Sequence, residues 1–123
     1  MAEIVGWVDL TLNHDSLDIE PVDGPAYKSP VFATTQEILD FFDANIATAR
    51  DVLATSDDKT FAETWTMLRQ GDIVFAMPKA AIIRTWVFNH LIHHRAYLCV
   101  YLRMNDVFVP GMYGPSSDEA VPT

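Results

Sequence analysis

The amino-acid sequence predicts an all-α protein made of a single domain. Three segments, residues 1–13, 34–57 and 78–104, place apolar residues at the three- and four-residue intervals of an amphipathic helix. The 123 residues are one domain's worth of chain, and 50% are hydrophobic against 20% charged, which is a globular composition. We therefore expect one helical domain over residues 1–123.

Charge and cysteine content exclude several classes of protein. Asp and Glu number 17 against 8 Lys and Arg, a formal net charge of −9. Nucleic acid and anionic membrane surfaces both require a basic face, so neither is expected as a partner. No apolar run approaches the roughly 20 residues that span a bilayer, and the N-terminus has no signal-peptide pattern. Since the one cysteine, Cys99, cannot form an internal disulfide, a cytoplasmic location is expected.

The first two predicted helices differ in how they begin. The helix over residues 1–13 is already periodic at its first residue, with no capping side chain before it. Residues 15–33, interrupted by Pro21, Pro25 and Pro30, predict a long ordered loop. The second helix then starts at a capping box, in which Thr34 precedes Glu37 by three residues.

The C-terminal half contains the longest predicted helix. Before it, two apolar runs flank Gln70-Gly71-Asp72 within residues 60–77, which indicates a short β-hairpin or an irregular excursion. Pro78 suits the first turn of the third helix, which ends before Asn105-Asp106. A Pro- and Gly-rich tail with acidic residues at its end follows.

Three histidines lie on this third helix. The core stripe is predicted to run through Ile83, Val87, Leu91, Leu98 and Tyr101, and two of the histidines fall within it. These two are the candidate metal ligands, His90 and His94, whose four-residue spacing puts both imidazoles on one face. His93 falls to the flank.

Two interpretations of the pair remain open from the residues alone. A shared metal ion would satisfy both buried rings, and hydrogen bonds to other helices would do the same. No glutamate stands inside the pair, so the zinc-protease motif is absent. Cys99 is predicted to pack as a small apolar residue, and His14 to suit the C-terminus of the first helix.

The residues around this pair resemble a known family. The segment 87–98, VFNHLIHHRAYL, is followed by YLR at 101–103 and by VPGMYGPS at 109–116, and together they resemble the DinB/YfiT-like family of small bacterial proteins. Residues 1–7 resemble the second-helix segment of that family, and the capped helix from Thr35 its third. The resemblance covers nearly the whole chain.

The resemblance implies an up-down-down-up four-helix bundle, often dimeric, with a divalent metal held by three histidines. Two of these correspond to His90 and His94, and zinc or nickel is the expected metal. The third would fall immediately before Met1, as would the family's first helix. About three of the four helices are therefore expected in an N-terminally truncated domain. Glu3 is the nearest substitute ligand, or else an exposed acid that suits the helix dipole.

The function implied by the resemblance is a metal-dependent enzyme. A thiol-dependent S-transferase, or a related hydrolase or isomerase, would use the metal to activate a thiol cosubstrate. His93 and Arg95 would lie at the rim, and Tyr97 and Tyr113 would position an electrophilic substrate. The alternative is a non-catalytic homodimer whose histidines are structural or bind metal adventitiously, since a second copy would cover exposed apolar surface.

Overall fold

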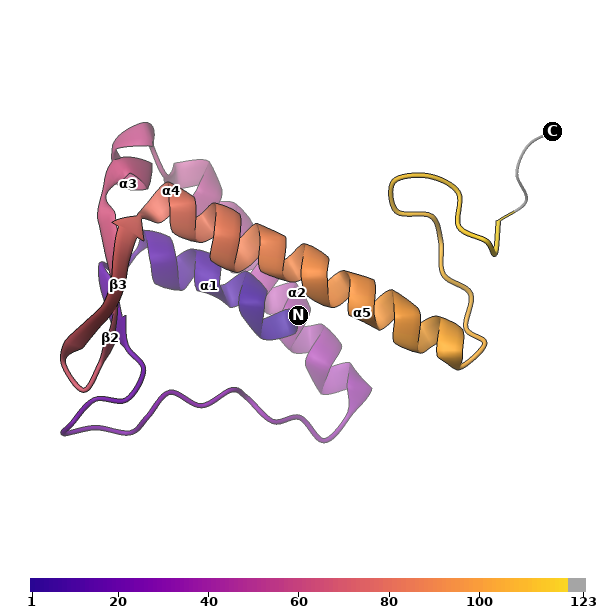
Figure 1. Ribbon diagram of the computed structural model, residues 1–123, viewed down its shortest axis with the longest axis horizontal. Coiled ribbons are helices and arrows are strands. Elements are labelled where there is room, and N and C mark those ends of the chain that lie inside the picture. The colour runs from indigo at the N-terminus through magenta and orange to yellow at the C-terminus, as the bar shows by residue number, and fades with distance from the viewer. Residues whose placement is uncertain (120–123) are drawn as a thin grey trace. The chain divides into compact units, whose positions relative to one another are not determined.

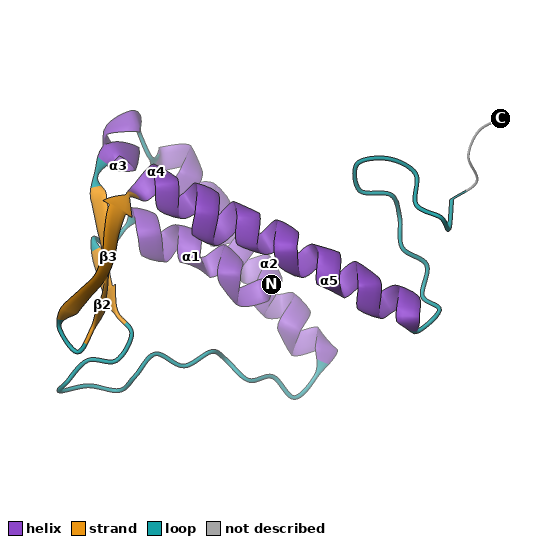
Figure 2. Cartoon of the chain, in the orientation of Figure 1, coloured by secondary structure: helices purple, strands orange, loops and turns teal. Residues whose placement is uncertain are grey.

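The computed structural model describes residues 1–119 and combines helices with a small sheet, as Figures 1 and 2 show. Helices make up 53% of the described residues and strands 13%. The chain forms two compact units, Met1–Leu91 and Ile92–Thr123. Within residues 1–119, no helix combines the length and the apolar character needed to cross a membrane.

The first unit alternates helices and strands along the chain. Its elements are α1 (Ala2–Leu12), β1 (Ser16–Asp18), α2 (Thr35–Thr55), α3 (Asp58–Ala62), β2 (Thr64–Arg69), β3 (Asp72–Pro78), α4 (Lys79–Ile82) and the π-helix η1 (Ile83–Asn89). The helix α5 (His90–Met104) begins at the end of this unit and continues in the second.

The predicted all-α four-helix bundle is wrong, because the described chain contains a three-stranded mixed sheet of order β1-β2-β3. The β2–β3 hairpin is antiparallel and lies in the segment for which a hairpin was one of two expectations. β1, by contrast, lies in a segment predicted to be loop. Three residues give no alternation to detect, and β1 forms because its backbone pairs in parallel with β2, which is distant in the sequence.

The long loop expected over residues 15–33 is anchored to the hairpin turn. Gln70 and Gly71 both have positive φ, 54° and 82°, as the two central residues of a tight type I′ hairpin turn require. Their N–H groups donate to the carboxylate of Asp18 at 3.1 and 2.8 Å. This carboxylate therefore holds the end of β1 against the turn of the hairpin.

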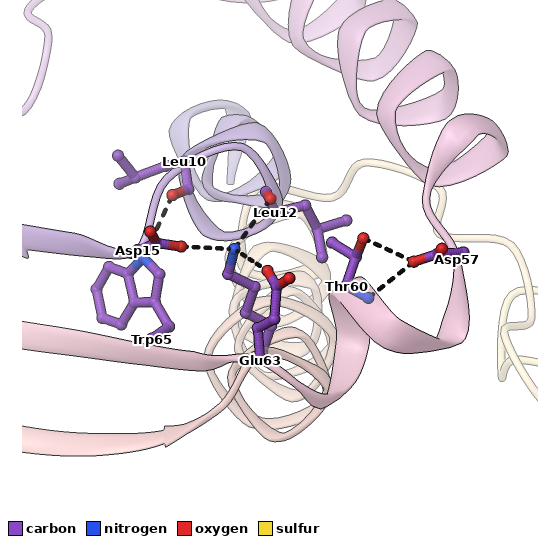
Figure 3. Close-up of polar contacts among 8 residues, drawn as sticks. Leu10, Leu12, Asp15, Asp57, Thr60, Glu63 and Trp65 are labelled. Carbon is purple, nitrogen blue, oxygen red and sulfur yellow. Dashed lines mark hydrogen bonds and ion pairs between the residues drawn. The ribbon is translucent and has the colours of Figure 1, made fainter.

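The predicted capping box of α2 is confirmed. Thr34 Oγ1 accepts a hydrogen bond from the Glu37 N–H at 3.2 Å, and the Glu37 carboxylate accepts from the N–H groups of Ala33 and Thr34. The helix ends at Thr55, close to the predicted stop. Asp57 then caps the short α3, as Figure 3 shows, by accepting from Thr60 N–H and Oγ1 at 2.8 Å.

The third predicted helix spans the expected residues but is not uniform. It consists of α4, η1 and α5 in direct succession, with π-type hydrogen bonds over Ile83–Asn89. A π-turn contains more residues than an α-turn, so the faces rotate away from those expected for a regular α-helix. Ile83 and Val87 are buried as predicted. Leu98 and Tyr101 are exposed for a different reason, because α5 has no buried residue on any of its faces.

The core of the first unit lies between α1, α2 and η1. Gly6 allows the close approach of the two long helices, because a Cβ at this position would lie 3.2 Å from the side chain of Asn45. Asn45 Nδ2 in turn donates to the carbonyl of Ala2 at 2.9 Å. The buried core residues are Ile4, Val5, Val8, Leu12, Ala49, Val52, Ile83 and Val87.

A buried lysine at the start of α4 joins the end of α1 to the segments that precede β1 and β2. The side chain of Lys79 is 3% exposed, and its ammonium group donates to the Leu12 carbonyl at 3.2 Å. It also pairs with Asp15 at 3.0 Å and with Glu63 at 3.1 Å. Figure 3 shows these acceptors converging at the end of α1, beside Trp65.

The surroundings of Lys79 favour its charged form. Burial alone lowers the pKa of an ammonium group, but the hydrogen bonds and charges of Asp15 and Glu63 outweigh this effect and raise the pKa of Lys79 above its ordinary value of 10.5. The contribution to stability is therefore complete below that value and is lost as the pH rises through the higher pKa of the folded state.

In the second unit, two acidic side chains hold the segment predicted as a tail in place by accepting hydrogen bonds. Asp118 accepts hydrogen bonds from Arg103 at 2.7 Å and from the Val109 N–H at 3.1 Å. The carboxylate of Glu119 accepts from the N–H groups of Gly111 and Ser116, and these bonds lower its pKa. The acids that were expected only as exposed tail residues therefore order residues 105–119.

Replacing the buried lysine should destabilise the first unit. In Lys79→Met, the Leu12 carbonyl loses its donor and two carboxylates lose their partner. Because Asp15 is 85% exposed and Glu63 46% exposed, both can be hydrated again. The free energy of unfolding should fall by about 1–3 kcal/mol, less than the roughly 3–5 kcal/mol of a fully buried pair. Denaturant titration measures it, with the exposed Lys28→Met as the control. An equal loss in both variants would contradict the role of Lys79.

The native protein and the Lys79→Met variant together test the direction of the Lys79 pKa shift. As the pH rises above about 10.5, the native protein should lose stability that Lys79→Met no longer has. The difference in unfolding free energy between the two should therefore shrink in alkaline solution and stay constant between neutral pH and about 10. A difference that grows with pH would mean that the folded state does not favour the charged lysine.

Candidate functional site

An apolar pocket of about 350 Å³ lies in the first unit, lined by residues of α1, all three strands, the loop after β1, α4 and η1. Of residues 1–119, none with a charged side chain lines the pocket, whereas all three tryptophans of the chain do. The aromatic part of the lining consists of Trp7, Tyr27, Trp65, Phe75 and Trp86. A cavity of this size and composition is typical of small-molecule sites.

Aromatic contacts order one wall of the pocket. The rings of Phe75 and Trp86 stack at 5.2 Å with an interplanar angle of 19°, and Trp65 packs against Phe75 at 6.2 Å. The indole N–H of Trp65 donates to the Leu10 carbonyl at 3.3 Å, as Figure 3 shows. The wall is therefore tied to α1 as well as to the hairpin.

Two side chains with hydroxyl groups line the pocket, Thr11 of α1 and Tyr27 of the long loop. The Thr11 hydroxyl donates to the Trp7 carbonyl at 2.7 Å. The Tyr27 hydroxyl donates to the carboxylate of Glu3 and accepts from the indole N–H of Trp7 at 3.3 Å. Burial raises the pKa of Tyr27, and the hydrogen bond to Glu3 raises it further, against a smaller opposing effect of Trp7. The phenol is therefore held in its protonated form, with its proton directed at Glu3.

One predicted metal ligand lies beside this pocket. His90 is half-buried, and its ring centroid is 5.5 Å from that of Trp7 at an angle of 47°. Trp7 follows Glu3 by about one turn of α1. The face of α1 that carries Glu3 therefore also carries the tryptophan that contacts His90. Glu3, for which a ligand role or an exposed position was expected, accepts a hydrogen bond from Tyr27.

The other candidate residues of the predicted site belong to the second unit. His93 makes edge contacts with His94 at 5.3 Å and with Tyr97 at 4.7 Å. Arg95 donates to the hydroxyl of Tyr113 at 2.9 Å. These contacts form two small groups. Elsewhere, His14 is exposed just after α1, and Cys99 is only partly buried.

The donor set fits a divalent metal in part. His90 and His94 supply two imidazoles from α5, and imidazole suits both zinc and nickel. Within residues 1–119, however, no group of three or more His, Cys, Asp or Glu side chains is placed to hold a metal ion together. The assignment of His90 and His94 as ligands stays a prediction.

No family model matches the chain, and neither a curated protein nor a solved structure matches it significantly.

Sequence reasoning missed most of the pocket. Trp65 and Trp86 stand far from Trp7 in the sequence and follow no common spacing. The one signal was the length of the loop over residues 15–33, which was expected to be ordered and which contributes Tyr27. The lining is assembled by the sheet, and β1 has no pattern from which its pairing could be predicted.

Alkaline titration should single out Tyr27 among the four tyrosines of the chain. Its tyrosinate absorbance should appear above the ordinary tyrosine pKa of 10.0, because burial and Glu3 both raise the pKa of Tyr27. Tyr27→Phe should remove this late step. Glu3→Gln should move the step to lower pH, since an amide no longer penalises the phenolate. Glu20→Gln is the matched control, and an equal shift in both Gln variants would contradict the assignment.

Proposed function

We propose that this protein is a divalent-metal-dependent enzyme of DinB-like type, with His90 and His94 as metal ligands. The observation that carries the proposal is the contact of His90 with Trp7, because Trp7 also lines the apolar pocket. A ligand-bearing histidine and a cavity large enough for a small substrate are thus joined by one side chain. The predicted reaction is a thiol-dependent S-transfer, or a related hydrolysis or isomerisation.

Different residues of the chain would hold the metal ligand, bind the substrate and position its reacting atoms. Trp7 packs against the His90 ring at a tilted angle. When bound, the metal supplies the Lewis acidity that lowers the pKa of a thiol cosubstrate. Arg95 donates to the Tyr113 oxygen, so the hydroxyl proton of Tyr113 stays available for an oxygen atom of an electrophilic substrate. His93 and Arg95 would lie at the rim, and Tyr97 would position the substrate together with Tyr113.

A second candidate function is association without catalysis. None of the residues of α5 is buried, and its apolar side chains include Ile92, Leu98 and Tyr101, which are 42%, 47% and 60% exposed. Exposed apolar surface of this kind favours a partner, and a second copy would cover it symmetrically. In such a cytoplasmic homodimer the histidines would be structural or would bind metal adventitiously.

Metal analysis separates the two candidates. Untagged protein should carry about one zinc or nickel ion per chain. His94→Ala should lower the metal affinity by at least about tenfold. Loss of a residue that hydrogen-bonds to a metal ligand already costs about that much, and loss of the ligand itself should cost no less. His14→Ala, on an exposed histidine, should keep full occupancy.

Folded wild-type protein with no metal above background would overturn the enzyme proposal. Equal metal loss from the His94 and His14 variants would do so as well. A dimer in sedimentation whose mass is unchanged in His94→Ala would then leave association as the function. If metal is found, turnover of electrophiles with low-molecular-weight thiols tests the reaction class.

A further inference from the structure

The chemistry of the pocket restricts what it can bind. A lining without charged side chains offers no counter-ion to a charged ligand, and burying an unpaired charge is costly. Five aromatic side chains, Trp7, Tyr27, Trp65, Phe75 and Trp86, instead offer ring faces and edges. About 350 Å³ is room for a compound of one or two rings. Tyr27 is 43% exposed and Trp86 39% exposed, so the pocket can be reached from solvent.

The hydrogen bonds of the two lining hydroxyls, Thr11 and Tyr27, specify the polar group of that compound. The Thr11 proton is donated within the protein, to the Trp7 carbonyl. The phenol proton is donated to Glu3, and the phenol oxygen accepts from Trp7. What remains on this oxygen is acceptor capacity alone. A ligand hydroxyl or N–H can use it, whereas a ligand carbonyl or ether oxygen cannot. A carboxylate would in addition be repelled by the nearby charge of Glu3.

We infer that the pocket of the first unit binds a neutral compound of one or two aromatic rings that carries a hydroxyl or N–H donor, and that Tyr27 accepts this donor. Phenols, naphthols and aromatic amines form the class. The inference goes beyond the proposed metal chemistry and needs neither the metal nor His94. The rings would contact the tryptophans, and the donor would complete the hydrogen bonds around the Tyr27 oxygen.

Three naphthalene probes separate the parts of this inference in isothermal titration calorimetry. The full chain is titrated in the presence of a chelator, so that failure of the metal proposal leaves the result untouched. 2-Naphthol should bind saturably, one per chain. 2-Methoxynaphthalene, which has the same rings without the donor, should bind about fivefold more weakly, the worth of one net hydrogen bond. 2-Naphthoate should bind at least about tenfold more weakly than 2-naphthol.

Two variants locate the binding. Tyr27→Phe should bring the affinities for 2-naphthol and 2-methoxynaphthalene to within about twofold of each other while keeping both measurable. Leu17→Trp enlarges a half-buried lining residue of β1 and should abolish binding of both. Leu39→Trp, on the exposed face of α2, is the matched control and should bind as the native chain does.

Several outcomes would overturn the inference. Absence of saturable 2-naphthol binding would do so, as would 2-naphthoate binding equal to that of 2-naphthol. An unchanged preference for 2-naphthol in Tyr27→Phe would remove Tyr27 from the site. Loss of binding as the protein concentration rises, together with a dimer mass in sedimentation, would show that a second copy fills the pocket instead.

Discussion

The buried ammonium group of Lys79 is the constraint on which the first unit depends. A cation that is 3% exposed must be neutralised and hydrogen-bonded, and here three acceptors from three places in the chain do so. They are the Leu12 carbonyl at the end of α1, Asp15 just before β1, and Glu63 just before β2. The backbone N–H of the lysine donates to the Glu63 carbonyl as well. The point where the hairpin meets the helices is thus set by one charge.

The position of this junction determines where the sheet lies relative to α1 and η1. β1 and β2 start beside the Lys79 cluster, and the β2–β3 hairpin extends from there, away from the end of α1 and the start of α4 (Figure 1). The apolar face of the sheet and the inner faces of α1 and η1 leave a pocket, which the large rings of three tryptophans line without filling. The loop after β1 is held by the Asp18 carboxylate and brings Tyr27 to the same place. A structural ion pair and a candidate binding site therefore share one architecture.

Local signals were sufficient for the helices but not for the sheet. The capping box of Thr34 and the spacing of Ile83 and Val87 act within a few residues, so their consequences could be predicted from the order of residues alone. The strand β1 could not, because it forms by pairing with β2, which is distant in the sequence. The all-α class was predicted because the local helix signals were detected, whereas the long-range pairing that forms the sheet was not.

The sequence by itself determined the places of the three helical segments and the spacing of His90 and His94, since each depends on neighbours in the chain. For residues 60–77 it left a hairpin and an irregular excursion as alternatives. It also determined the acidic charge balance. Only the tertiary structure decided that His90 meets Trp7, that Glu3 holds Tyr27, and that three scattered tryptophans line one pocket. The physical reason is that burial and ring contact depend on distance in space, and strand pairing brings residues together that no sequence period connects.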